Sequence, residues 1–169
     1  MRRFFIQIIL SLIGLGSMAA PPVRIRPHIA HIAKKLNSAS LVHFGYAVGF
    51  AGRRESNNKY YKLYLKLKRI ARTKELVALS EQHGQKIVVY AFSILHTRQF
   101  PELKDIFLQH RNDSTWYWTA GGCTGVLNRI NWFMLQRMRP IEKEGIKNFL
   151  SKEEYEELQK EIRGSDLQY

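Results

Sequence analysis

The sequence predicts an all-α fold, a short stack of antiparallel helix pairs forming an α-solenoid, and three observations lead to it. Apolar residues recur at helical spacing through most of the chain after residue 57. No segment shows a convincing alternation of apolar and polar residues, which is the pattern of a half-buried strand. A short pattern also recurs 27 residues further along the chain, as stacked helical repeats do. The length of 169 residues and the hydrophobic content of 45% are enough for one domain with a core.

The chain begins with the features of an export signal. A cationic start, Met1-Arg2-Arg3, precedes an uncharged and mostly apolar run over residues 4–16, and Ser17 and Ala19 supply the small residues of a cleavage site. A membrane-spanning helix needs about 20 apolar residues, more than this run provides. We therefore expect a signal peptide over residues 1–19 and an exported protein, periplasmic or secreted, with an uncleaved signal anchor as the alternative.

The rest of the chain divides into three parts by composition. Residues 20–56 form an N-terminal extension, with a short helix expected at 28–36 and an apolar, glycine-containing stretch at 41–52 that is either a packed loop or a buried helix. Residues 57–138 form the helical repeat core, and residues 139–169 a charged C-terminal helix. In the last part Ser151 and Glu154 have the spacing of a capping box that opens a helix to about residue 162.

Within the core, successive helices follow from periodicity and from breakers. A helical pattern starts at Asn57 and carries an amphipathic stripe over residues 60–71. Residues 75–83 form a helix with Thr73 as its N-cap, and Gly84 ends it. Residues 86–98 are apolar nearly all round, which predicts a buried helix. Pro101 starts a further helix, and after residues 112–115 one longer helix is expected through Gln136, kinked near Gly121-Gly122.

The internal repeat relates residues 75–83 to residues 102–110. The matched residues are Glu75 and Glu102, Leu76 and Leu103, Leu79 and Ile106, Gln82 and Gln109, and His83 and His110, and the same offset aligns Tyr90 with Tyr117. Repeating helix pairs bury their apolar faces on one another, so we expect one contiguous core made of Leu76, Leu79, Tyr90, Ala91, Ile94, Leu103, Ile106 and Phe107. Two amphipathic helices that coincide by chance are the alternative.

Several of these residues also carry a resemblance to a family. The stretch Gly49-Phe50-Ala51-Gly52 with Ser56, the pair Tyr60-Tyr61 and the repeat pattern around His83 resemble small exported bacterial HEAT-like proteins. Val88-Val89-Tyr90-Ala91-Phe92 is similar to the second-helix consensus V-R-x-Y-A of such repeats, with Val89 in place of the basic residue. The resemblance covers about residues 45–135. It implies a HEAT-like α-solenoid in the cell envelope and supplies no catalytic residues.

Charge is distributed unevenly along the chain. The 27 Lys and Arg against 14 Asp and Glu give a net charge of +13, which favours anionic partners. Residues 53–74 carry nine basic residues and one acid, whereas residues 142–169 carry eight acids and five bases. Lys62, Lys66 and Arg69 share the helix face opposite the apolar stripe. This face is either a docking surface or a solvated surface partly neutralised by the acidic tail.

The residues that could carry chemistry form no complete set. His83 and His110 are either a metal pair or caps of helix ends, and His28 and His31 lie one turn apart with no carboxylate nearby. Cys123, between glycines, is either a nucleophile or a small residue where two helices approach closely. The sequence therefore predicts no catalytic residue, no metal site, no cofactor and no enzyme.

The predicted function is that of an exported, non-enzymatic helical repeat module that binds a macromolecular partner in the envelope. The expected partner is a protein, and the candidate binding residues are Lys62, Lys66, Arg69, Trp116, Tyr117 and Trp118. The alternative is a peripheral envelope protein whose basic helix adsorbs to anionic lipid or polysaccharide. Because an exported protein rarely meets DNA or RNA, we expect no nucleic-acid partner.

Overall fold

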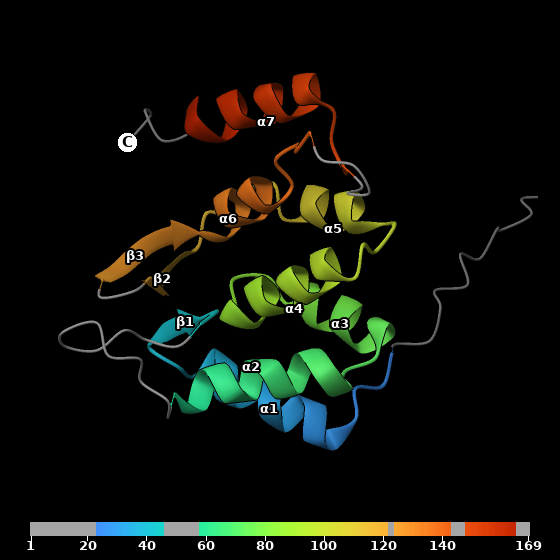
Figure 1. Cartoon of the computed structure of the whole chain (residues 1–169), viewed down its shortest axis with the longest axis vertical. Helices are drawn as coiled ribbons and strands as arrows, with labels where there is room; N and C mark the ends of the chain where they lie inside the picture. Colours follow the sequence, from blue (N-terminus) through green and yellow to red (C-terminus); the bar gives the residue numbers. More distant parts are fainter. Residues whose placement is uncertain (1–22, 46–57, 122–123, 143–147, 165–169) are drawn as a thin grey trace, which may run out of the picture.

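The computed structural model of this chain describes residues 23–45, 58–121, 124–142 and 148–164. Within these ranges it contains seven helices and a three-stranded sheet (Figure 1). The helices are α1 (Pro27–Asn37), α2 (Lys59–Ile70), α3 (Thr73–Ser80), α4 (Lys86–Thr97), α5 (Leu103–Gln109), α6 (Ile130–Arg137) and α7 (Lys152–Gly164). The strands are β1 (Leu41–His43), β2 (Trp116–Gly121) and β3 (Thr124–Arg129). The predicted signal peptide, residues 49–52 and Cys123 lie outside the described residues.

The helices follow one another along the long axis of the molecule. Figure 1 shows α1 and α2 at one end, α3 and α4 next, then α5 and α6, and α7 at the opposite end. Helix α4 lies at the centre and packs against α1, α3, α5 and α6. All its residues from Ile87 to Leu95 are buried, which confirms the buried helix predicted from its uniformly apolar sequence.

The prediction of an all-α solenoid is wrong, because a mixed sheet lies beside the helices. Strand β2 pairs antiparallel with β3, and β1 joins the other edge of β2 in parallel, with Leu41 opposite Trp118. Of the helix predicted through Gln136, only α6 is present. The repeat also ends after its first helix, since Tyr90 lies in α4 whereas Tyr117 lies in β2.

The sequence did not predict the strands, because apolar residues point to both faces of β2. Tyr117 is buried, while its neighbours Trp116 and Trp118 are exposed on the other face. A strand normally alternates polar with apolar residues, but here both faces carry aromatic rings, so no alternation appears in the sequence. The signal that was present is different: aromatic and β-branched residues on both sides of Gly121-Gly122, a composition typical of a hairpin.

Three helix starts show how their first turns are capped, and one of them confirms a predicted cap. Ser151 and Glu154 form the predicted capping box, with the Glu154 N–H donating to Ser151 Oγ and the Ser151 N–H to the Glu154 carboxylate. The Asn58 side chain accepts from two N–H groups in the first turn of α2. Thr73, expected as an N-cap, is instead the first residue of α3, and Arg72 occupies the cap position.

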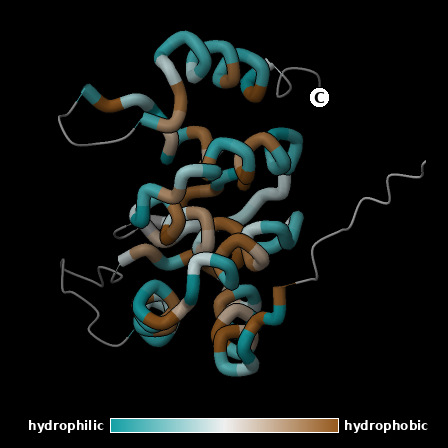
Figure 2. Tube along the Cα trace, turned by 90° about the vertical axis from the view of Figure 1, so that its right-hand side faces the viewer, coloured by the Kyte–Doolittle hydropathy of each residue, from teal (hydrophilic) through white to brown (hydrophobic). Residues whose placement is uncertain are grey.

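One hydrophobic cluster extends from α1 to α7 and includes the sheet. All eight residues expected in the core belong to it, so that prediction is confirmed. The partly buried tyrosines and leucines of α2 pack against its margin, which confirms the amphipathic stripe. Figure 2 shows α7, at the top of the view, as a mostly hydrophilic helix. Its buried residues, Tyr155 and Ile162, lie two helical turns apart on the same side of the helix.

A partly buried ion pair joins the start of α1 to the corner between α2 and α3. The Arg26 guanidinium donates to both Glu75 carboxylate oxygens, at 2.8 and 2.6 Å, and also to the Ile70 carbonyl. These side-chain bonds, opposed by burial and supported by the Arg72 N–H, lower the pKa of Glu75 to about 2. Its repeat counterpart Glu102 is exposed, and the Glu102 side chain makes no capping hydrogen bond at the start of α5. The two matched glutamates therefore have different roles.

Candidate functional site

The first candidate surface is the basic face of α2, which we define as Lys62, Leu65, Lys66 and Arg69. These four side chains are exposed and line a hollow of about 390 Å³. Tyr64 and Leu67, on the other side of the helix, are buried in the core. Because α2 packs with α1 and β1 through that apolar side, the i, i+4, i+7 spacing leaves the three cations on the outside.

The acid-rich helix α7 does not cover this face. It lies at the opposite end of the molecule from α2 and packs on α6 (Figure 1). Two of its carboxylates form ion pairs beside α5, Glu154 with Lys104 at 2.6 Å and Glu161 with Arg111 at 3.2 Å. Within the described ranges, none of the ion pairs involves Lys66 or Arg69. The described part of the acidic tail therefore lies away from the basic face and pairs with neither Lys66 nor Arg69.

The second candidate surface lies on β2, and here the structure separates the three predicted residues. Trp116 and Trp118 are 59% and 49% exposed, and Leu127 lies opposite Trp118 on the same face. The Arg129 guanidinium lies 5.5 Å from the Trp116 ring. Tyr117 is buried on the other face, so its prediction as a binding residue is corrected to a core role. Burial raises the pKa of Tyr117 well above its ordinary value.

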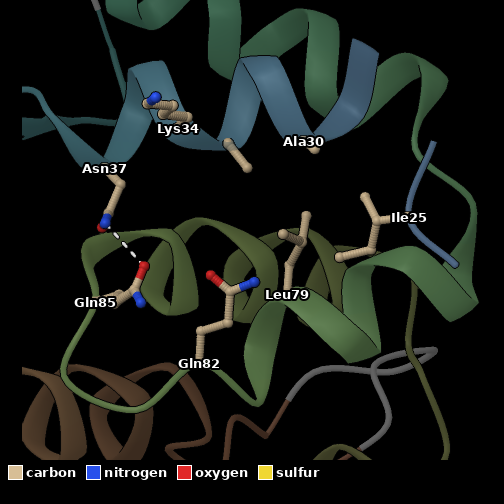
Figure 3. A pocket seen from close by; sticks show the side chains of 8 residues that line it. Ile25, Ala30, Lys34, Asn37, Leu79, Gln82 and Gln85 are labelled. Atoms are coloured by element: carbon tan, nitrogen blue, oxygen red, sulfur yellow. Dashed lines mark hydrogen bonds between the residues drawn. The ribbon is translucent and has the colours of Figure 1, made fainter. Parts of the chain in front are cut away.

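Two further hollows are of different character. One of about 380 Å³ borders the exposed tryptophans, with Lys86 and Thr115 supplying polar groups. The other, of about 200 Å³, lies between α1 and α3 (Figure 3). Figure 3 shows the Asn37–Gln85 hydrogen bond of 2.8 Å at one side of it and the apolar side chains of Ile25 and Leu79 at the other. This second hollow is below the 300–1,000 Å³ that is typical of small-molecule sites.

A third feature is a cluster of His83, His110 and Asp113, whose potential ligand atoms all lie within 4.8 Å of one another. The two imidazole rings are stacked, with their centroids 4.1 Å apart. His110 is fully buried, and its Nε2 lies 2.5 Å from the carbonyl oxygen of Ser80, the last residue of α3. The His110 side chain therefore caps the C-terminus of α3, whereas a capping role in its own helix was expected; at the end of α5 it is the backbone N–H of His110 that bonds the Phe107 carbonyl.

Asp113 completes the cluster from the loop before β2. One carboxylate oxygen accepts from the Gly84 N–H at 3.0 Å and the other from the Thr115 N–H at 3.2 Å. Burial on its own would raise the pKa of Asp113, but the hydrogen bonds from Gly84 and Thr115 hold it below its usual value. Asp113 was not predicted as a ligand, because the polar residues 112–115 fit a turn and helix cap. Its spacing of three residues from His110 was the available signal.

Within the described residues, His28 and His31 gain no third potential ligand. His28 and His31 are both exposed on α1. Among the described residues, the cluster of His83, His110 and Asp113 is the only group of three potential metal ligands.

Comparison with protein-family models, with curated proteins and with solved structures gives no match. Membership of the small exported HEAT-like proteins therefore stays a prediction. The all-α fold that this resemblance implied is wrong, because the structure contains a three-stranded sheet. None of the helices within the described residues is both long enough and apolar enough to cross a bilayer.

Proposed function

We propose that this chain is a non-enzymatic binding module of the cell envelope, and that the basic face of α2 binds an acidic segment of a protein partner. The observation that carries the proposal is the hollow of about 390 Å³ on this face, bordered by three cationic side chains and left uncovered by α7. Three cations within two helical turns create a positive local potential, which favours and steers an acidic partner.

The shape of the face supports a protein partner over a membrane. Leu65, 40% exposed at the centre, offers an apolar contact between the cations, which is the arrangement of an interface with charges around its margin. A membrane-surface helix instead inserts a broad apolar side, but in α2 that side is packed in the core. Lipid binding would thus rest on charge alone, at about 1 kcal/mol for each Lys or Arg near an anionic surface.

The experiment places a photo-crosslinking amino acid at position 65 in the full chain and identifies the proteins attached in the native envelope. We expect a discrete acidic partner whose crosslink disappears in the variant K62E/K66E/R69E. The matched control is K34E/K35E/K160E, which reverses three exposed lysines on α1 and α7 and changes the net charge equally. The control variant should retain the crosslink. The wild-type crosslink should also weaken with salt, because the Debye length falls from about 10 Å at 0.1 M to about 3 Å at 1 M.

The same pair of variants separates the rival functions. Sedimentation with vesicles that contain anionic lipid, compared with neutral vesicles, tests adsorption to a membrane. Salt-sensitive sedimentation that the triple reversal abolishes, without any protein crosslink, would replace the proposed partner by a lipid surface. Envelope binding that survives both the triple reversal and high salt would show the basic face to be ordinary solvated surface. Recognition would then belong to the exposed face of Trp116 and Trp118.

A further inference from the structure

We propose that His83, His110 and Asp113 form a binding site for a divalent transition-metal ion of the zinc type. The three residues come from two separate loops: His83 from the turn between α3 and α4, and the other two from the segment between α5 and β2. Their nearest ligand atoms lie within 4.8 Å of one another. This inference concerns a different part of the molecule from the basic face of α2 and does not depend on the proposed function.

The orientation of the His110 ring places one of its nitrogens against Asp113. The Ser80 carbonyl oxygen, 2.5 Å from Nε2, can only accept a hydrogen bond, so Nε2 must carry a proton. In neutral His110 the second ring nitrogen, Nδ1, then carries a lone pair and lies 3.3 Å from Asp113 Oδ2. Both atoms of this contact are hydrogen-bond acceptors. Two acceptors that face each other in a buried position are unfavourable, and the repulsion is relieved either by a proton on Nδ1 or by a metal ion bound to both atoms.

The surroundings match those of metal ligands in other respects. A histidine that binds a metal usually donates its second ring N–H to a carbonyl or carboxylate, as His110 does to Ser80. Ligating carboxylates are themselves held by hydrogen bonds, and Asp113 accepts from the backbone N–H groups of Gly84 and Thr115. Both groups are therefore fixed in position before any ion arrives.

His83 provides the accessible side of the site. It is exposed, and its ring already lies against that of His110. The following residue, Gly84, has a φ of 71°, a left-handed conformation that glycine adopts without strain, and it places the turn over Asp113. Because the third ligand comes from the surface, an ion can enter from solvent. A fourth coordination position then stays open for water or for a side chain of a partner.

The ligand types indicate which metal is bound. Two imidazole nitrogens and one carboxylate are the donors of zinc sites that keep an open fourth position. Calcium and magnesium prefer sites made of oxygen donors alone, so they should bind weakly here. The competing arrangement holds no metal: His110 carries a second proton and pairs with Asp113 as a cation.

The experiment is titration of metal-free full-length protein with Zn²⁺, with Mg²⁺ and Ca²⁺ in parallel, by isothermal calorimetry. We expect one equivalent of Zn²⁺ to bind and Mg²⁺ and Ca²⁺ to bind far more weakly. His83→Ala and Asp113→Asn should each weaken Zn²⁺ binding at least tenfold, since removal of even an outer-shell partner costs about 10–100-fold. His31→Ala removes an exposed histidine elsewhere and is the matched control, with unchanged affinity.

Thermal unfolding provides the second measurement. Zn²⁺ bound to the native state should raise Tm in the wild type and in His31→Ala, and should not do so in His83→Ala. His83 is exposed, so its replacement leaves the core intact and the apo variant should unfold at the wild-type temperature. Absence of Zn²⁺ binding to the wild type, or equal binding by His83→Ala, would overturn the proposed site.

Discussion

Replacement of Glu75 by glutamine removes the charge at the centre of the link between α1 and α3. In the wild type the carboxylate, 2% exposed, accepts three hydrogen bonds from Arg26, one of them from its backbone N–H, and one from the Arg72 N–H. Glutamine has nearly the same shape but only one acceptor oxygen. Its amide group must point an N–H towards donors that previously faced an oxygen, so at least one buried donor loses its partner.

The expected magnitude follows from the pKa of this carboxyl. Hydrogen bonds from Arg26 lower the pKa from 4.5 to about 2, and each pKa unit corresponds to about 1.4 kcal/mol, which gives at most about 3 kcal/mol. The Arg26 side chain is 31% exposed and can be rehydrated once the charge is gone, which reduces the loss. We therefore expect Glu75→Gln to lower the free energy of unfolding by about 2 kcal/mol at pH 7.

The pH dependence identifies the cause. Because the native pKa is depressed, the folded state binds the proton more weakly than the unfolded state, so the stabilisation is complete above about pH 5 and is lost as pH falls towards 2. Urea unfolding of wild type and Glu75→Gln should thus differ less at pH 3 than at pH 7. Glu157→Gln, at an exposed position of α7, is the control and should change stability by less than about 0.5 kcal/mol. Equal stabilities of Glu75→Gln and the wild type at pH 7, or a stability difference that does not change with pH, would refute this account.

Two further predictions concern the core, and urea unfolding measures both. Within the described residues the buried Tyr117 hydroxyl has no hydrogen-bond partner, so Tyr117→Phe should leave stability unchanged or raise it by up to about 1 kcal/mol. Tyr90→Phe should instead lower the free energy of unfolding by about 1–3 kcal/mol, because the Tyr90 hydroxyl accepts from the His43 N–H at 2.8 Å. Equal effects of the two changes would contradict the hydrogen-bond assignment. Leu79→Ala, at a 1% exposed position, should lower the free energy of unfolding by about 2–5 kcal/mol. Leu108→Ala, on the exposed side of α5, should lower it by less than about 1 kcal/mol. A small loss at Leu79 would contradict the packed core.

The sequence by itself determined most of the helical core. Helices α2 and α4 follow from local spacing, since apolar residues every three or four positions fix which side is buried, whatever packs against it. The capping box of Ser151 and Glu154 is equally local, because both partners lie within one turn. The cations of the basic face were placed correctly on the outside for the same reason: their position follows from the opposite, apolar side of α2.

Tertiary structure decided the sheet and the two clusters of polar residues. Strand β1 has three residues and pairs with β2 across more than 70 positions of sequence, so nothing near Leu41 identifies its partner Trp118. His83 and His110 are separated by 27 residues in the repeat, and only the tertiary arrangement that brings the end of α3 next to the end of α5 stacks their rings and places Asp113 beside them. Local sequence encodes which face of an element is buried, whereas contacts between distant segments depend on how the elements pack together.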